Sequence, residues 1–114
     1  MTTDLAQRHC VPCEGDVAPM SRHTAEEYLT DVPGWSLVDG EPLKLTREWK
    51  FKNFVESITF INKVADIAED EQHHPDIHIS WNRVKLELFT HSIGGLSEND
   101  FILAAKINEL KGGP

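Results

Sequence analysis

The sequence predicts an α+β fold of two layers: a four-stranded antiparallel sheet, made of two hairpins, with helices packed on one face. Two segments alternate apolar and polar residues with a period of two, which is typical of strands with one face on a core and one face in water. Each belongs to a pair of strand-like segments joined by a short turn. Helical patterns stand before, between and after the two pairs, so the expected order is helix, hairpin, helix, hairpin, helix.

The length and charge of the chain limit its architecture and its partners. With 114 residues, 39% of them hydrophobic, it should form one domain over residues 21–111, after an irregular arm over residues 1–20. Nineteen acidic residues against eleven basic ones give a net charge of −8, which argues against a nucleic-acid partner. No apolar run approaches the ~18 residues of a membrane span, and the N-terminus lacks the apolar core of a signal peptide, so we expect a cytoplasmic protein.

The first half of the domain should hold one helix and one hairpin. A helix is expected near residues 22–31, with Ser21 as its N-cap and a Pro-Gly pair beyond its end. An Asp-Gly pair then marks a hairpin whose return strand covers residues 43–51. The odd positions of that strand are apolar except for Arg47, which we expect at a rim or an interface.

The second helix should begin after Asn53, its N-cap, and run to about Glu71. It must end there because Pro75 disfavours helical dihedral angles in the residue before it. Its apolar residues recur at alternating steps of four and three, which predicts one buried stripe: Phe54, Ile58, Ile61, Ala65 and Ala68.

A second hairpin and a last helix complete the predicted domain. The strands should cover residues 77–81 and 84–89, with a turn at residues 82–83. Ser97 and Asp100 have the spacing of a capping pair at the start of the last helix. The apolar side of that helix is expected to comprise Phe101, Ala104, Ala105, Ile107 and Leu110. The other sheet face stays open, and its unpaired edges favour a symmetric homodimer or homotetramer.

Cys10 and Cys13 are the two cysteines of the chain and are spaced C-x-x-C. Three interpretations remain open: two free thiols on the arm, a metal or interchain contact, and a redox pair. A zinc site would need further ligands, for which His9 and His23 are candidates. The redox interpretation is disfavoured because the surrounding Pro- and Gly-rich segment lacks the strand and helix of a thioredoxin-like motif.

Four of the six histidines are grouped late in the chain: His73, His74, His78 and His91. The first two stand where a helix should end, and His91 stands where a strand should end, so they can meet at one end of the sheet. Glu69 lies one helical turn before His73 and should orient its ring. Nearby acids and the helix C-terminus favour the protonated imidazole, which suits acid–base chemistry near neutral pH. His78 is the expected bystander because it lies within a strand.

A metal site is the alternative for these histidines, with His74, His78 and His91 as three ligands. Pro75 disfavours it, because an H-x-x-x-H pair converges on one metal only when both residues lie on a helix. In a strand the two histidines would be about 13 Å apart. We therefore expect a site without metal.

The strings EDEQHHPDI and SWNRVKLELFTHSIGGLSENDFILAAKI closely resemble the pterin-4a-carbinolamine dehydratase family, over about residues 35–110. The combination of the H-H-P triplet with the later THSIGGLSEND segment is specific, whereas H-H-P alone would not be. The resemblance implies a four-stranded antiparallel sheet backed by helices, as derived above. It also implies a hydro-lyase that converts 4a-hydroxytetrahydropterin to quinonoid dihydropterin, with the pterin as substrate and no cofactor or metal.

By position, the resemblance assigns the three catalytic histidines of the family to His73, His74 and His91. It assigns substrate-binding positions to Glu69, Asp100 and Trp35, although Asp100 equally suits a helix cap and Trp35 equally suits the core. Two positions depart from animal members, which carry Asp and Tyr there: Gln72 and Trp81.

The implied reaction needs two proton movements, and two imidazoles on opposite sides of a bound ring could perform them. We assign proton transfer to His73 and His91, and binding and orientation to His74. Such enzymes recycle the pterin cofactor of aromatic amino acid hydroxylases. Animal members also act as a dimerisation cofactor for a homeodomain transcription factor, so a protein-binding module is the alternative function.

Overall fold

The computed structural model describes residues 5–11 and 18–110. The described elements are η1 (Leu5–Gln7), α1 (Arg22–Leu29), β1 (Ser36–Val38), β2 (Lys44–Lys50), α2 (Phe54–Glu71), β3 (Asp76–Ser80), β4 (Arg83–Leu88), η2 (His91–Ile93) and α3 (Glu98–Asn108). The predicted α+β fold with two hairpins is confirmed. Within the described ranges, none of the helices combines the length and the apolar character that crossing a bilayer requires.

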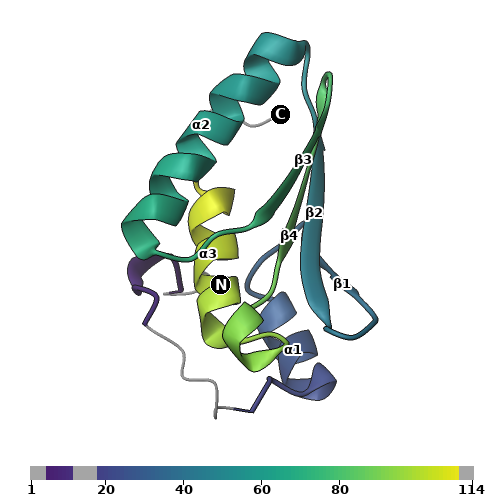
Figure 1. Cartoon of the computed structure of the whole chain (residues 1–114), viewed down its shortest axis with the longest axis vertical. Coiled ribbons are helices and arrows are strands. Elements are labelled where there is room, and N and C mark those ends of the chain that lie inside the picture. The colour runs from purple at the N-terminus through teal and green to yellow at the C-terminus, as the bar shows by residue number, and fades with distance from the viewer. Residues whose placement is uncertain (1–4, 12–17, 111–114) are drawn as a thin grey trace.

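The four strands form one antiparallel sheet in the order β1-β2-β4-β3, so β1 and β3 are its edges. Helices α2 and α3 lie on one side of the sheet (Figure 1), and α2 packs directly on it, because the ring centroid of its Phe60 lies 4.8 Å from that of Trp49 on β2. The register places Leu45 opposite Leu88 and Trp49 opposite Val84, so the apolar positions of β2 and β4 face the helices together. The predicted alternation of the return strand is therefore confirmed.

The second hairpin turns one residue earlier than predicted. Ser80 pairs with Arg83, so the turn consists of Trp81 and Asn82 rather than residues 82–83. The backbone of Phe51 explains the shift: its N–H donates to the Asn82 carbonyl (2.7 Å), and its carbonyl accepts from the Asn82 side chain (3.1 Å). These bonds fix Asn82 in the turn and leave Trp81 with 67% of its surface exposed.

The buried face of α2 differs from the predicted stripe. Phe54 is 50% exposed, and Ala65 also faces solvent. The buried row lies about one residue, or 100°, around the helix and comprises Ser57, Phe60, Val64, Ala68 and Glu71. The pattern was ambiguous because α2 carries apolar residues on more than one side. Only the contacts of α2 with α3 and the sheet determine which side is buried.

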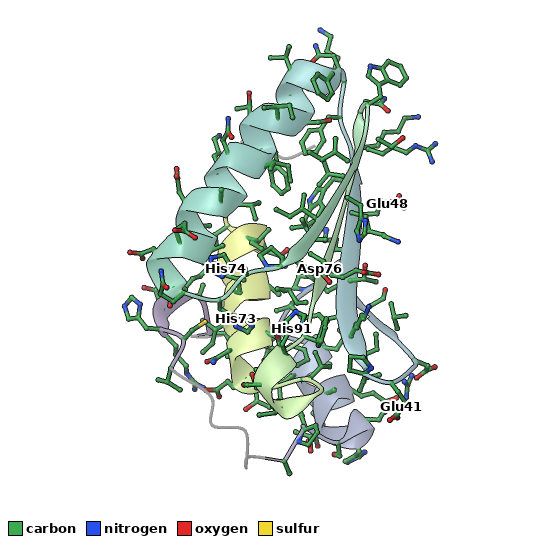
Figure 2. All side chains as sticks on the ribbon, in the orientation of Figure 1. Glu41, Glu48, His73, His74, Asp76 and His91 are labelled. Carbon is green, nitrogen blue, oxygen red and sulfur yellow. The ribbon has the colours of Figure 1, made fainter. Side chains whose placement is uncertain are left out.

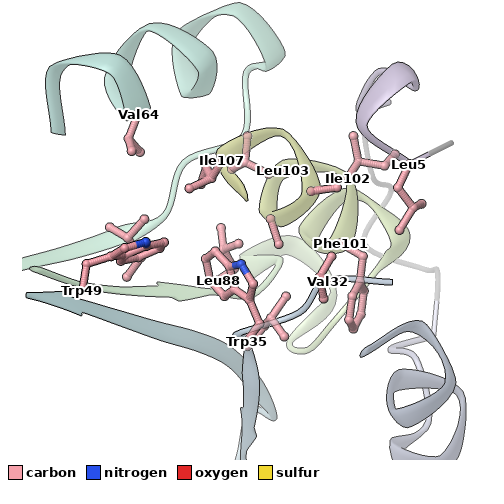
Figure 3. Packing of buried hydrophobic residues seen from close by; sticks show 14 of the residues in the cluster. Leu5, Val32, Trp35, Trp49, Val64, Leu88, Phe101, Ile102, Leu103 and Ile107 are labelled. Atoms are coloured by element: carbon pink, nitrogen blue, oxygen red, sulfur yellow. The ribbon is translucent and has the colours of Figure 1, made fainter. Parts of the chain in front are cut away.

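Helix α3 is buried on nearly every side, beyond the one apolar side that was predicted. Figure 3 shows Leu103 and Ile107 of α3 in one cluster with Val64 of α2, Trp49 of β2 and Trp35, which directly precedes β1. Ile102, on the side near Leu5 of η1, is 1% exposed. A helix enclosed by a sheet, a long helix and the N-terminal segment needs apolar residues all round.

Arg47 and Gly34 form a close contact at the rim of the core. The Arg47 guanidinium lies 4.8 Å from the centroid of the Trp49 ring and donates to Asn108 Oδ1 at 2.7 Å. Burial lowers the pKa of this guanidinium. Gly34 has a φ of +90°, and a Cβ added there would lie 2.6 Å from Arg47 Cζ.

Candidate active site

A cleft of about 660 Å³ opens where α2 ends, β4 ends and α3 begins. It is lined by residues 9–11, 70–76 and 89–92 together with Asn99. All three predicted catalytic histidines belong to this lining, and Figure 2 shows them gathered near the C-terminal end of α2. Segments that are far apart in the sequence thus meet at one end of the molecule, as the junction argument predicted.

The end of α2 sets the directions of His73 and His74. Gln72 adopts a left-handed conformation (φ 54°) as C-cap, and its N–H donates to the Ala68 carbonyl. The His73 N–H donates to the same carbonyl at 3.1 Å. This sharp reversal ends the helix directly before the double histidine, where Pro75 required it to end.

His73 is held by a buried carboxylate. Its Nε2 lies 2.6 Å from Asp100 Oδ1, and its side chain is 12% exposed while that of Asp100 is fully buried. An ionised carboxylate only accepts hydrogen bonds, so Nε2 donates in this pair. In the neutral ring, Nδ1 then carries the lone pair.

The second oxygen of Asp100 caps α3. Oδ2 accepts from the Ser97 N–H at 2.9 Å and from Thr90 Oγ1 at 3.0 Å. The geometry therefore allows Asp100 to fill both roles considered for it, a helix cap and a site residue. One carboxylate contacts both the α3 terminus and a histidine of the cleft.

Glu69 pairs with His74 rather than with His73. The distance from His74 Nε2 to Glu69 Oε2 is 2.6 Å, and both side chains are more than half exposed. The expectation that Glu69 orients His73 is wrong, because the left-handed Gln72 turns His73 toward α3 and leaves His74 beside the last turn of α2. Glu69 itself does not line the cleft.

His91 begins η2 on another wall of the cleft. It is exposed, and its ring centroid lies 4.1 Å from that of Phe89, with the two planes tilted by 44°. Lys44 Nζ lies 5.3 Å from the centroid of the Phe89 ring. His91 therefore rests on an aromatic surface, whereas His73 is held by a carboxylate.

Trp35 and His78 lie outside the lining of the cleft. Trp35 is 4% exposed in the core, packs edge-on against Trp49 and donates from Nε1 to Asn108 Oδ1 at 2.8 Å. Its position matches the core alternative considered from the sequence. His78 lies on β3, where its Nε2 is 3.4 Å from Glu87 Oε1.

Sequence reasoning missed Glu71, and it did not place His9 and Cys10 beside the histidine cleft. The Glu71 side chain is 3% exposed, and its carboxylate accepts from the Cys10 N–H at 2.7 Å and contacts His9 Nδ1 at 2.9 Å. Burial alone would raise the pKa of Glu71, but these hydrogen bonds and the Lys106 ammonium outweigh it and lower that pKa. The available signal was that Glu71 continues the helical row of Val64 and Ala68.

The cysteine interpretations remain predictions. Cys10 is half-buried with its Sγ 3.5 Å from the Asn99 carbonyl, while Cys13 lies outside the described residues. His23, a candidate fourth ligand, lies on α1 at 3.8 Å from Glu27. Among residues 5–11 and 18–110, no three His, Cys, Asp or Glu side chains are grouped as a metal ion would need.

Comparison with known proteins identifies a family. The family model described as Pterin 4 alpha carbinolamine dehydratase matches residues 18–110. A protein of Arabidopsis thaliana, pterin-4-alpha-carbinolamine dehydratase 2, mitochondrial, is 53% identical over 111 residues, which span 95% of this chain and 59% of that protein. A protein of Halorhodospira halophila, provisionally named pterin-4-alpha-carbinolamine dehydratase, is 48% identical over 106 residues. The match covers 93% of this chain and 96% of that protein.

A solved structure has a similar fold. The crystal structure described as a transcriptional coactivator/pterin dehydratase from Brucella melitensis superimposes with a TM-score of 0.74 at 37% identity. The match covers 79% of this chain and 95% of that one.

Proposed function

The chain belongs to the pterin 4 alpha carbinolamine dehydratase family, and from this premise we propose that it dehydrates a 4a-hydroxytetrahydropterin to the quinonoid dihydropterin. One observation carries the proposal at the site: three histidines line a single cleft, and a buried carboxylate holds one of them. The product would return the pterin cofactor of an aromatic amino acid hydroxylase to its cycle. We expect this to occur in the cytoplasm.

The reaction breaks one bond to oxygen and moves two protons. The C4a–O bond breaks, and the departing hydroxyl takes up a proton to leave as water. N5–H loses its proton, and its electron pair forms the N5=C4a double bond. Atoms and charges balance without an oxidant, a reductant or a second substrate, so two positioned acid–base groups are sufficient.

We assign one proton transfer to His73 and the other to His91. The pair of His73 with Asp100 supports the first assignment, because a donor bond from Nε2 leaves Nδ1 to exchange a proton with the substrate. The position of His91 on a different wall of the cleft supports the second.

His74 is proposed to bind and orient the substrate. It lines the cleft but is paired with the exposed Glu69, so its ring is held less firmly than that of His73. We place Asp100 behind His73 as a positioning residue. Trp35 has no assigned contact with the substrate, since it lies in the core.

The decisive experiment is the dehydration rate of three single variants. His73→Ala and His91→Ala should each lower kcat by about 10²–10⁴-fold with a smaller change in KM. His78→Ala is the control and should leave both constants near their wild-type values, because His78 lies outside the cleft. Loss of activity in His78→Ala alone would refute the proposed site.

The same assay tests the proposal that no metal takes part. Protein treated with a chelator and then gel-filtered should keep its full rate. Activity that disappears on chelation and returns with added zinc would replace the acid–base proposal with a metal mechanism.

A protein-binding role is the second candidate, favoured by the description of the Brucella melitensis structure as a transcriptional coactivator/pterin dehydratase. The exposed Phe54 and Val55 of α2 offer an apolar surface for the helix of a partner protein. One set of variants distinguishes the two functions: His73→Ala and His91→Ala should strongly lower the dehydration rate and leave partner binding unchanged.

A further inference from the structure

The N-terminal residues 5–11 lie outside the part of the chain that the family model matches, yet His9, Cys10 and Val11 line the cleft together with the three histidines. In Figure 1 this segment lies beside the C-terminal end of α2. The mechanism proposed above makes no use of it, nor of the buried Glu71.

We propose that residues 5–11 form one wall of the pterin site, and that Glu71 and Asn99 are the positioning residues that hold this wall. The inference rests on the proposed dehydratase function. It deepens that function by assigning part of the substrate affinity to a segment that precedes the residues matched by the family model.

The beginning of the segment is anchored along α3. Leu5 is 3% exposed and belongs to the main hydrophobic core. Lys106 Nζ donates to the Ala6 carbonyl at 2.9 Å, and the Arg8 guanidinium donates to Glu98 Oε2 at 2.6 Å. These contacts follow α3 toward its N-terminus and so bring His9 to the edge of the cleft.

Asn99 then binds both backbone groups of Val11. Its Oδ1 accepts from the Val11 N–H at 3.0 Å, and its Nδ2 donates to the Val11 carbonyl at 2.5 Å. A side-chain amide that pairs with both polar groups of one residue reproduces the exchange between paired strands. Glu71 accepts the N–H of the preceding residue, Cys10, so consecutive residues of the segment are fixed from α2 and α3.

The side chain of Val11 is exposed at the rim of the cleft, with 64% of its surface in water. An apolar group that is exposed on a cleft wall is typical of a surface that a bound ring covers. A pterin ring system is flat and can cover Val11 without disturbing the hydrogen bonds of the segment. The wall holds substrate and transition state equally, so its loss should raise KM more than it lowers kcat.

Asn99→Asp tests the proposal in the full chain. The carboxylate still accepts from Val11 N–H, but its other oxygen repels the Val11 carbonyl, and the first turn of α3 tolerates the added charge. Asn62→Asp is the matched control, since it makes the same change at an exposed position of α2. Val11→Ala removes only the proposed contact surface and leaves every backbone bond in place.

Three readouts apply to each variant: KM and kcat for dehydration, the Kd of oxidised pterin as an unreactive probe, and the rate of tryptic cleavage after Arg8. Asn99→Asp should raise KM and Kd by about five- to tenfold, keep kcat within about twofold, and accelerate the cleavage. Val11→Ala should raise Kd by about two- to fourfold without faster cleavage. Bound pterin should slow cleavage of the wild type, because linkage between two sites is reciprocal.

The outcomes separate this inference from the function on which it rests. If Asn99→Asp speeds cleavage but KM and Kd match those of Asn62→Asp in an active enzyme, the segment is not a wall of the site. If cleavage is also unchanged, Asn99 does not hold the segment, and the inference fails as well. If the wild type binds pterin without dehydrating a carbinolamine, the proposed reaction fails, and the ratio of Kd values still decides the role of the segment. A wild type that neither binds nor turns over pterins overturns both.

Discussion

Asp100 joins the fold and the site through its two oxygens, because Oδ1 contacts His73 and Oδ2 caps α3. An amide in its place can accept on one side but must donate on the other. If it keeps the cap, it presents its NH₂ to His73 and reverses the ring's donor and acceptor nitrogens. Nδ1, the nitrogen proposed to exchange a proton with the substrate, would then carry a hydrogen instead of the lone pair.

We therefore expect Asp100→Asn to lower kcat by roughly 10- to 1000-fold and to cost about 1 kcal/mol of stability, because a neutral amide replaces a buried carboxylate that makes three hydrogen bonds. In a His73→Ala background the same change should lower Tm again but add little further loss of kcat, because Asp100 acts on the reaction through His73. If the losses of kcat from the two single variants multiply in the double variant, Asp100 does not act through His73.

Glu71 should make stability depend on pH in the acid range. Its pKa in the folded protein lies below the ordinary value of 4.5, so its contribution is fully present above that value and is lost as the pH falls through the folded pKa. Glu71→Gln removes the titration. Urea unfolding of both proteins should give a stability difference that shrinks as the pH falls from about 6 to about 3. A difference that stays constant over this range would show that Glu71 is not the group responsible.

The sequence predicted part of the site at the level of single residues. His73, His74 and His91 reach one cleft as expected, because the ends of α2 and β4 are fixed by Pro75 and by strand length. The partner of His73 was not predictable from helical spacing, since that spacing pointed to Glu69 and ignored the left-handed Gln72. The contact between His9 and Glu71 was missed because it spans 62 residues, and no local pattern encodes such a distance.

At the level of elements, helix limits were more predictable than helix faces. Ser21 accepts the Thr24 N–H and Asn53 accepts the Glu56 N–H, so the expected N-caps of α1 and α2 are present. Which faces of α2 and α3 are buried depends on the elements packed against them, and the local sequence does not show which elements these are. In α2 several apolar rows competed, and in α3 all sides are covered.

The connection between α1 and β1 offers a test of backbone conformation. Gly34→Ala should destabilise the protein by about 1–2 kcal/mol for its left-handed dihedral angle, with a further loss because the new methyl group meets Arg47. Gly94→Ala is the control: its φ is +70°, but no atom lies within 4 Å of the new methyl group. Thermal unfolding should give a larger loss for Gly34→Ala. Equal losses would mean that Arg47 moves aside at no cost.

At the level of the whole molecule, the exposed apolar residues favour self-association. Five of them lie at the start of α2, on the edge strand β3 and in the turn that follows it: Phe54, Val55, Ile77, Ile79 and Trp81. We expect sedimentation at micromolar concentration to give the mass of a symmetric dimer or tetramer. Ile77→Lys should weaken an assembly through the β3 edge, and Val55→Lys one through α2. A sharp monomer mass for the wild type would refute the prediction.

The bond between Val11 and Asn99 joins positions 88 residues apart, which has a consequence for folding. Closing so long a loop costs chain entropy that is recovered only after the intervening helices and strands are in place. The wall of the cleft should therefore assemble last during folding and open first during partial unfolding. A refolding chain would regain its helical signal before it regains a closed cleft, and ligand binding would report the final step of folding rather than the average of all of them.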